Sequence, residues 1–324
     1  MTIKIDVVVP LALKDIPKLQ ICIENLVAHS LTPIRNIYII SNNNIILNNL
    51  FIDKPLIWVN EAEFPFTKED IENIFKSKQC MYQHTSWYYQ QLLKFYIFRV
   101  IPDLLPNTLI LDSDYVFIKD IKFLTDDGKA ILASGYPFKW LLNTKEYPYP
   151  PIHIHVSFAT RFIPKWFPVS SFSGMQHHML FQKDIVEELF SIIAETHKQE
   201  FWKAFVENIE VEKWNAASEY VIYYHFVMGR KANKVITRNL KTCDFIYDSK
   251  ENELMLEKVK QLRDNSNFQA IGCHAFLDLR KRLETMDYIP SALKQRMLSS
   301  GIMAFKLILD DGILQIEEIE FQNQ

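Results

Sequence analysis

The chain has 324 residues, 48% of them hydrophobic, and a formal net charge of −3 at pH 7. This composition excludes a disordered chain and gives no electrostatic reason to expect nucleic acid binding. The N-terminal apolar run is short and contains Asp6 and Pro10, which predicts neither a signal peptide nor a membrane span. The 4 cysteines form no Cys-x-x-Cys pair, so we expect reduced thiols and a cytoplasmic protein.

The chain begins with a pattern typical of a parallel sheet. An apolar run from Ile3 to Val9 predicts a buried strand that ends at Pro10. Apolar residues at helical spacing between 19 and 27 predict a helix, and residues 37–40 predict a second strand. We therefore expect an α/β fold with a parallel sheet, which binds ligands at the carboxyl ends of its strands.

The next segments extend this pattern. We expect a short helix at 45–50, a strand at 56–59 and a helix that starts near Lys68, after a Thr-x-x-Asp capping box at Thr67. A further helix from 87 to 100 carries Lys94 on or beside its surface. Later strands are predicted at 108–111, 130–134, 235–237 and 270–274.

Two carboxylates interrupt a buried apolar stretch between Leu109 and Ile118. Residues i and i+2 of an extended chain point to the same side, so Asp112 and Asp114 can face one site. Two acids this close repel each other and are costly to desolvate unless a cation lies between them. Carboxylate oxygens suit Mg²⁺ or Mn²⁺, which also bind phosphates. The pattern predicts a metal–diphosphate site; the alternative is a polar turn with two solvated aspartates.

A segment rich in aromatic residues and proline follows, from 136 to 168. A loop of this kind either lines or covers a binding site, or is simply packed. Beyond it, His177 and His178 are adjacent in a predicted strand and point to opposite faces, so they cannot readily share one metal. One is expected to be a core residue and the other a site residue, with nothing in the pattern to distinguish them.

Two later residues have both a structural and a functional interpretation. Ser218 predicts the start of a helix, where the dipole favours an acid at Glu219; alternatively, this carboxylate meets an acceptor hydroxyl. His274 ends a predicted strand, and a single histidine is more often structural than functional. Residues 305–319 predict a hairpin, which could be a small appendage or the edge of a dimer.

The order of these motifs resembles the metal-dependent nucleotide-sugar glycosyltransferases of the GT-A fold, particularly a bacterial and viral branch implicated in surface-glycan synthesis. The resemblance rests on the strand that ends at Pro10, Gln-Gln-Leu-Leu-Lys at 90–94 and Leu-Asp-Ser-Asp-Tyr-Val-Phe at 111–117. It continues with Gly-Met-Gln-His-His-Met-Leu-Phe at 174–181, Ser-Glu-Tyr at 218–220 and the late His274. It implies a Rossmann-like α/β domain over 1–300, with a mixed, mostly parallel sheet flanked by helices. The nucleotide-binding half of this domain would extend to about 135 and the acceptor half would begin at about 136, with a hairpin appendage at 301–324.

The resemblance also implies roles for individual residues. The implied metal ligands are Asp112, Asp114 and His274, and the ion is Mn²⁺ or Mg²⁺. The implied catalytic residues are Glu219, Asp114 and His178. The residues implied to contact the nucleotide-sugar donor are Pro10, Lys94, Asp112, Ser113, Asp114 and His177.

The same resemblance implies a reaction. A divalent ion would neutralise the charge that builds on the diphosphate leaving group. Glu219 would take the proton of the acceptor hydroxyl if the reaction inverts configuration, and would only orient the acceptor if it retains it. The segment 136–168 would close over the donor and exclude water. The donor implied is a UDP-sugar, and the acceptor is a glycan, a lipid-linked glycan or a protein hydroxyl. Glycine is scarce near the aspartates, which departs from the family and leaves the contacts with the donor sugar open.

Two other functions fit part of the pattern. Asp112-x-Asp114-x-Val116 also matches the signature of phosphatases that form an aspartyl-phosphate on Mg²⁺. That chemistry usually lies on the first strand and needs a later acidic pair, whereas Asp310 and Asp311 lie in a predicted hairpin turn. The third possibility is a catalytically inactive glycan-binding protein with the same fold.

Overall fold

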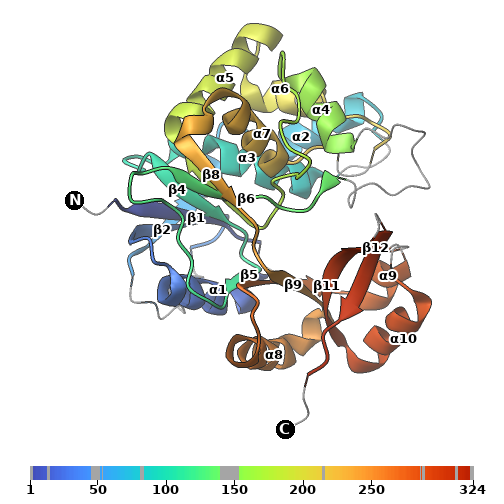
Figure 1. The fold of residues 1–324 in the computed structure, drawn as a ribbon. Helices are drawn as coiled ribbons and strands as arrows, with labels where there is room; N and C mark the ends of the chain where they lie inside the picture. Colours follow the sequence, from blue (N-terminus) through green and yellow to red (C-terminus); the bar gives the residue numbers. More distant parts are fainter. Residues whose placement is uncertain are drawn as a thin grey trace. The chain divides into compact units, whose positions relative to one another are not determined.

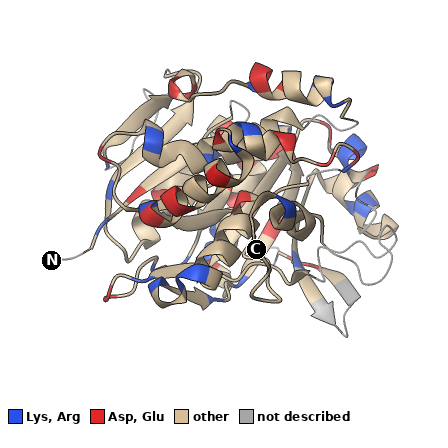
Figure 2. Ribbon diagram, turned by 90° about the horizontal axis from the view of Figure 1, so that it is seen from above, with Lys and Arg blue, Asp and Glu red and all other residues tan. Residues whose placement is uncertain are grey.

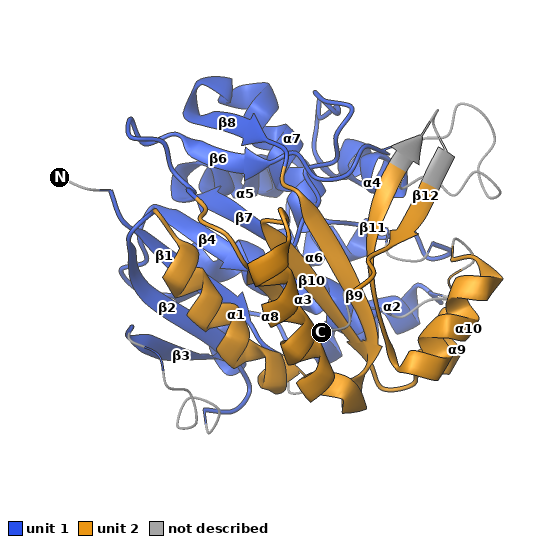
Figure 3. Cartoon of the chain, turned by 60° about the horizontal axis from the view of Figure 1, so that its bottom comes forward, with its two compact units in different colours: residues 1–11, 32–111, 122–239 blue, residues 12–31, 112–121, 240–324 orange. Residues whose placement is uncertain are grey.

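The computed structural model describes residues 3–12, 15–44, 52, 54–80, 84–138, 153–213, 216–284, 286, 289–310 and 313–321. Helices and strands mix along this chain, which confirms the predicted α/β class (Figure 1). The chain forms two compact units that are interleaved in sequence (Figure 3). Unit 1 contains residues 1–11, 32–111 and 122–239, and unit 2 contains residues 12–31, 112–121 and 240–324.

Unit 1 is built on a five-stranded sheet with the strand order β3-β2-β1-β4-β7. These strands are β1 (Ile5–Pro10), β2 (Ile34–Ser41), β3 (Leu56–Asn60), β4 (Asn107–Leu111) and β7 (His178–Gln182). Strands β1 to β4 are parallel, and β7 pairs antiparallel with β4. Every residue of the central strand β1 is buried, as expected for an apolar strand that is covered on both faces. The predicted mostly parallel sheet is confirmed.

Six helices are described in unit 1. They are α2 (Lys68–Ser77), α3 (Thr85–Val100), α4 (Ile154–Phe162), α5 (Lys183–His197), α6 (Phe201–Glu207) and α7 (Glu219–Arg230). At the start of α2, Thr67 Oγ1 accepts from the Asp70 N–H at 3.2 Å, and the Asp70 carboxylate accepts from the Thr67 N–H at 2.7 Å. This reciprocal pair confirms the predicted capping box. Strands β6 (Ala130–Ala133) and β8 (Val235–Arg238) form a separate parallel pair.

The aromatic segment 136–168 is not one continuous loop, because helix α4 lies within it. The rings of Phe158 and Phe162 lie 5.0 and 5.6 Å from the ring of Phe205 in α6. This packing stabilises a helix where weak periodicity predicted a loop. The central part of the predicted lid, residues 139–152, and the helix predicted at 45–50 lie outside the described residues.

Unit 2 contains a second five-stranded sheet with the order β12-β11-β9-β10-β5. Its strands are β5 (Tyr115–Phe117), β9 (Thr242–Asp248), β10 (Ala270–Phe276), β11 (Ile302–Asp310) and β12 (Ile313–Glu318). Strands β9 and β10 are parallel, and the other pairs are antiparallel. The predicted C-terminal hairpin is present as β11 and β12. It is an integral part of the sheet and not an appendage, because β11 pairs with β9.

The helices of unit 2 are α1 (Ile16–His29), α8 (Asn252–Asn265), α9 (Leu279–Glu284) and α10 (Ser291–Ser300). Helix α1 packs against β5 and lies beside α8. One buried cluster joins Val116 of β5, Phe245 of β9 and Ile271 of β10 to Met255 and Val259 of α8. This core fixes the three strands that carry the site described below.

The boundaries of the two units differ from the predicted division of the chain near residues 135 and 300. Contacts between residues distant in sequence define them, and these contacts leave no local signal. Within the described residues, every helix is too short or too polar to span a bilayer. Basic and acidic residues are both spread over many of the elements drawn in Figure 2, in keeping with the small net charge of −3.

Candidate metal site in unit 2

The predicted acidic pair lies in a turn that precedes β5. The Tyr115 N–H donates to the Asp112 carbonyl at 3.2 Å, and residues 113 and 114 have turn geometry. The expectation that both side chains share one side of an extended strand is therefore wrong. The turn brings them together instead, with one carboxylate oxygen of Asp112 within 4.8 Å of one of Asp114. Ser113, between them, is buried.

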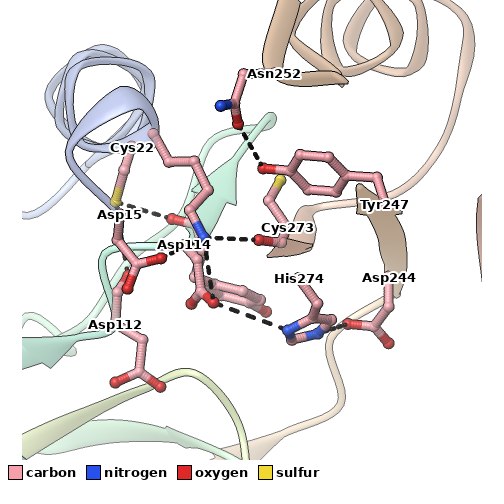
Figure 4. A network of polar contacts seen from close by, with 11 residues as sticks. Asp15, Cys22, Asp112, Asp114, Asp244, Tyr247, Asn252, Cys273 and His274 are labelled. Atoms are coloured by element: carbon pink, nitrogen blue, oxygen red, sulfur yellow. Dashed lines mark hydrogen bonds and ion pairs between the residues drawn. The ribbon is translucent and has the colours of Figure 1, made fainter. Parts of the chain in front are cut away.

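His274 reaches this turn because β10 pairs with β5. Gly272 lies opposite Tyr115 in the antiparallel ladder, and the Cys273 N–H donates to the Asp114 carbonyl at 2.7 Å. His274 Nδ1 consequently lies 3.8 Å from Asp114 Oδ2 (Figure 4). Asp114 therefore lies close to both of the other predicted metal ligands, Asp112 and His274.

A further carboxylate, Asp244 on β9, holds the other side of the histidine ring. His274 Nε2 lies 3.2 Å from Asp244 Oδ1 (Figure 4). Asp244 was not predicted as a site residue, because no strand was predicted at 242–248. The available signal was the β-branched and aromatic run Phe245-Ile246-Tyr247, which directly follows Asp244.

Lys18 is a second residue near the site that was not predicted from the sequence. Its Nζ lies 2.7 Å from Asp15 Oδ1 and 3.8 Å from Asp114 Oδ2, and it donates to the Cys273 carbonyl at 3.1 Å. The side chain is 2% exposed. A signal was present, because Lys18 precedes Cys22 by four positions on the apolar face of the predicted helix. A lysine on such a face predicts a buried partner.

Two thiols border the cluster but do not add soft ligands to it. Burial raises the pKa of the Cys22 thiol well above its usual range, and the Asp114 carboxylate raises it further. Burial likewise raises the pKa of Cys273. Both thiols are therefore protonated at neutral pH, and Cys22 Sγ donates to the Tyr115 carbonyl at 3.1 Å. The donor atoms left for a cation are carboxylate oxygens and an imidazole nitrogen.

The charge balance of the cluster favours a cation. The buried Lys18 ammonium lies near the carboxylates of Asp15 and Asp114, while Asp112 adds a further carboxylate beside Asp114 and Asp244 one beside His274. Asp114 Oδ2 and His274 Nδ1, 3.8 Å apart, can bind a single ion at about 2.1 Å from each. An oxygen-rich donor set with one imidazole fits Mn²⁺, and also Mg²⁺ with phosphate oxygens as further ligands. The residues present therefore fit the metal that the sequence predicts.

Two other predicted site residues, Lys94 and Glu219, meet in unit 1. Lys94 Nζ on α3 lies 2.6 Å from Glu219 Oε1 in the first turn of α7, and 3.1 Å from the Tyr220 hydroxyl. Their side chains are 3% and 4% exposed. Ser218 caps α7 as predicted, since its Oγ accepts from the Val221 N–H at 3.4 Å. The predicted contacts of Lys94 with nucleotide and of Glu219 with an acceptor stay predictions, and each would require this buried ion pair to separate.

The adjacent histidines have different surroundings. His178 begins β7 opposite Leu111, is 2% exposed and lies 6.0 Å from the Phe123 ring. His177 precedes the strand and is only partly buried. The burial identifies His178 as the core histidine of the pair and leaves His177 as the more accessible one. Pro10 ends β1 opposite Ile40 of β2, at the carboxyl edge of the unit 1 sheet, where the base was predicted to bind.

Comparison of the chain with models of known protein families and with curated proteins gave no match.

Proposed function

We propose that this chain is a metal-dependent glycosyltransferase of the GT-A type. It moves a sugar from a nucleotide-sugar donor, a UDP-sugar, to a hydroxyl group of a glycan or another acceptor. The single observation that carries the proposal is the position of Asp114 in unit 2, within 4.8 Å of Asp112 and 3.8 Å from the His274 imidazole. The mostly parallel sheet of unit 1 is compatible with it.

The metal ligands would be Asp114, His274 and Asp112. A bound divalent ion supplies Lewis acid chemistry, which stabilises the negative charge of a diphosphate leaving group. Lys18 holds Asp114 from the protein side, because its ammonium lies 3.8 Å from Asp114 Oδ2. Asp114 is thereby oriented before any ion binds, which lowers the entropy lost on binding.

The family resemblance assigns the remaining parts of the substrates to other residues. Pro10, at the end of β1, would contact the base, and His177 would contact the donor. Glu219 would accept the proton of the acceptor hydroxyl in an inverting reaction, or orient the acceptor in a retaining one. The Glu219 carboxylate is held by Lys94 at 2.6 Å, so proton transfer would require Lys94 to shift to another partner.

Release of free nucleotide from a panel of nucleotide sugars tests this function. We expect release from a UDP-sugar that depends on Mn²⁺ and is lost in Asp114→Ala. The matched control is Asp126→Ala, since the Asp126 side chain is 97% exposed and a solvent-exposed ion pair such as the one it forms with Lys122 contributes little to stability. Its rate should equal that of the wild type.

The same samples separate the alternatives. Phosphate released from simple phosphomonoesters, with no nucleotide release, would indicate the aspartyl-phosphate phosphatase. Thermal stabilisation by glycans without any turnover would indicate a glycan-binding protein. Nucleotide release that does not respond to Mn²⁺ or to Asp114→Ala would contradict the proposed function.

A further inference from the structure

We infer that Asp244 and Gly272 form a positioning device that presents His274 Nδ1 to the metal. This inference rests on the metal site of the proposed function. It concerns two residues outside the Asp-x-Asp motif.

Asp244 determines which nitrogen of the ring carries the proton. His274 Nε2 lies 3.2 Å from Asp244 Oδ1, and this carboxylate is 10% exposed. A buried carboxylate accepts a hydrogen bond, so Nε2 donates and Nδ1 is left with its lone pair free of a proton. Nδ1 is also the nitrogen that lies 3.8 Å from Asp114 Oδ2. The ring is therefore held in the tautomer and orientation that metal binding requires.

Strand register places the two side chains together. In the parallel ladder of β9 and β10, Asp244 is paired with Gly272, and His274 follows Gly272 by two positions. Paired residues and residues two apart project from the same face of a sheet. Asp244, Gly272 and His274 consequently share one face, with the glycine between the two functional groups.

Gly272 provides the space in which the hydrogen bond forms. A Cβ at this position would overlap Asp244 Oδ1 and would lie only 2.9 Å from His274 Nε2. Any side chain at 272 would push the carboxylate and the ring apart. The backbone dihedral angles do not require a glycine here, because Gly272 does not have a positive φ. The requirement for glycine is therefore one of space beside the hydrogen bond.

Direct Mn²⁺ binding, measured from the electron paramagnetic resonance signal of free Mn²⁺ with MnCl₂ as the sole ligand, tests this device. We expect Asp244→Ala and Gly272→Ala each to weaken Mn²⁺ binding by roughly 10- to 100-fold. Asp244→Asn retains an acceptor oxygen and should recover much of the affinity. The control Gly229→Ala introduces a Cβ at an exposed helical position with only an ordinary contact, 3.4 Å from Val169, and should bind like the wild type.

A double-mutant cycle separates positioning from direct ligation. In a His274→Ala background, Asp244→Ala should cause no further loss of Mn²⁺ affinity, because Asp244 acts only through the ring. A further loss in that background would identify Asp244 as a ligand in its own right and overturn the inference. Circular dichroism of each variant establishes that it is folded, and the Asp244→Asn rescue keeps the test valid if Gly272→Ala does not fold.

The outcome also distinguishes this inference from the proposed function. If the wild type binds Mn²⁺ and Asp244→Ala binds it equally well, the positioning role is wrong and the metal site stands. If the wild type binds no Mn²⁺, the metal site and the device are both wrong. If the variants behave as expected but no nucleotide sugar is turned over, the device stands and the transferase assignment fails.

Discussion

Lys18 and Asp114 link helix α1 to the acidic turn of unit 2, with Nζ 3.8 Å from Oδ2. The same ammonium lies 2.7 Å from Asp15 Oδ1 and donates to the Cys273 carbonyl at 3.1 Å. One buried cation therefore connects a helix, a turn and strand β10. It offsets part of the repulsion among the carboxylates, so its loss should affect stability directly.

Replacing Lys18 by methionine keeps much of its volume and removes its charge. Because the side chain is 2% exposed, water cannot replace the lost partner of Asp15, and the free energy of unfolding should fall by about 3 kcal/mol. Urea unfolding followed by circular dichroism measures this change. The control Lys122→Met disrupts an exposed ion pair with Asp126 and should cost less than about 1 kcal/mol. Equal losses in the two variants would show that Lys18 has no special structural role.

The buried ion pair of Lys94 and Glu219 predicts strong coupling between two substitutions. Lys94→Met leaves the Glu219 carboxylate, 4% exposed, without its closest cation, and should destabilise unit 1 by about 3 kcal/mol or more. Lys94→Met combined with Glu219→Gln removes both charges and should recover a large part of this loss. Urea unfolding of the two single variants and the double variant gives the coupling free energy. Additive losses would show that the two charges do not depend on each other.

His225 predicts a pH dependence of stability. Burial lowers its pKa to about 4 from an ordinary value of 6.5. The unfolded chain therefore binds a proton between pH 6.5 and 4 that the folded chain does not bind. The free energy of unfolding should fall as the pH falls through this window, by up to about 3 kcal/mol.

The variant His225→Gln isolates this contribution. It removes the titrating ring but keeps an acceptor for the Val169 N–H, which donates to His225 Nδ1 at 3.1 Å. Between pH 7 and pH 4.5, the stability of the variant should fall less steeply than that of the wild type in urea titrations. Parallel curves would mean that the buried imidazole does not contribute to acid destabilisation.

Binding of Mn²⁺ to the folded chain should raise its thermal stability. An ion that binds only the native state at about 100 times its Kd stabilises that state by about 2.7 kcal/mol, and Tm rises accordingly. Scanning calorimetry should show a rise with MnCl₂ that EDTA reverses and that Asp114→Asn abolishes. Asp126→Asn, at an exposed position, should retain the full rise. A rise of equal size in Asp114→Asn would place the ion elsewhere.

The sequence predicted the local elements of the fold well. Valine-rich β1, the capping box at Thr67 and the apolar strand before Asp112 each carry their signal within a few residues. These segments were sufficient to predict parallel strands that alternate with helices. The helix inside the aromatic segment was not predicted, because its own sequence has little helical periodicity. Contacts of Phe158 and Phe162 with α6 stabilise it instead.

The residues of the site were predicted only in part, because its geometry also depends on contacts between distant segments. Asp112, Asp114 and His274 were identified from motif order, but their geometry depends on a turn and on the pairing of β10 with β5. Asp244 lies 30 residues from His274, and only the register of β9 on β10 brings the two together. Register between distant strands is set by the folded core and leaves no pattern in the local sequence.

The most direct test of the metal–diphosphate site is a crystal structure determined with Mn²⁺ and uridine diphosphate. We expect an anomalous manganese peak bound by Asp114 and His274, with Asp112 beside the nucleotide and the diphosphate oxygens completing the coordination. A well-ordered map without manganese or nucleotide at these residues would contradict it.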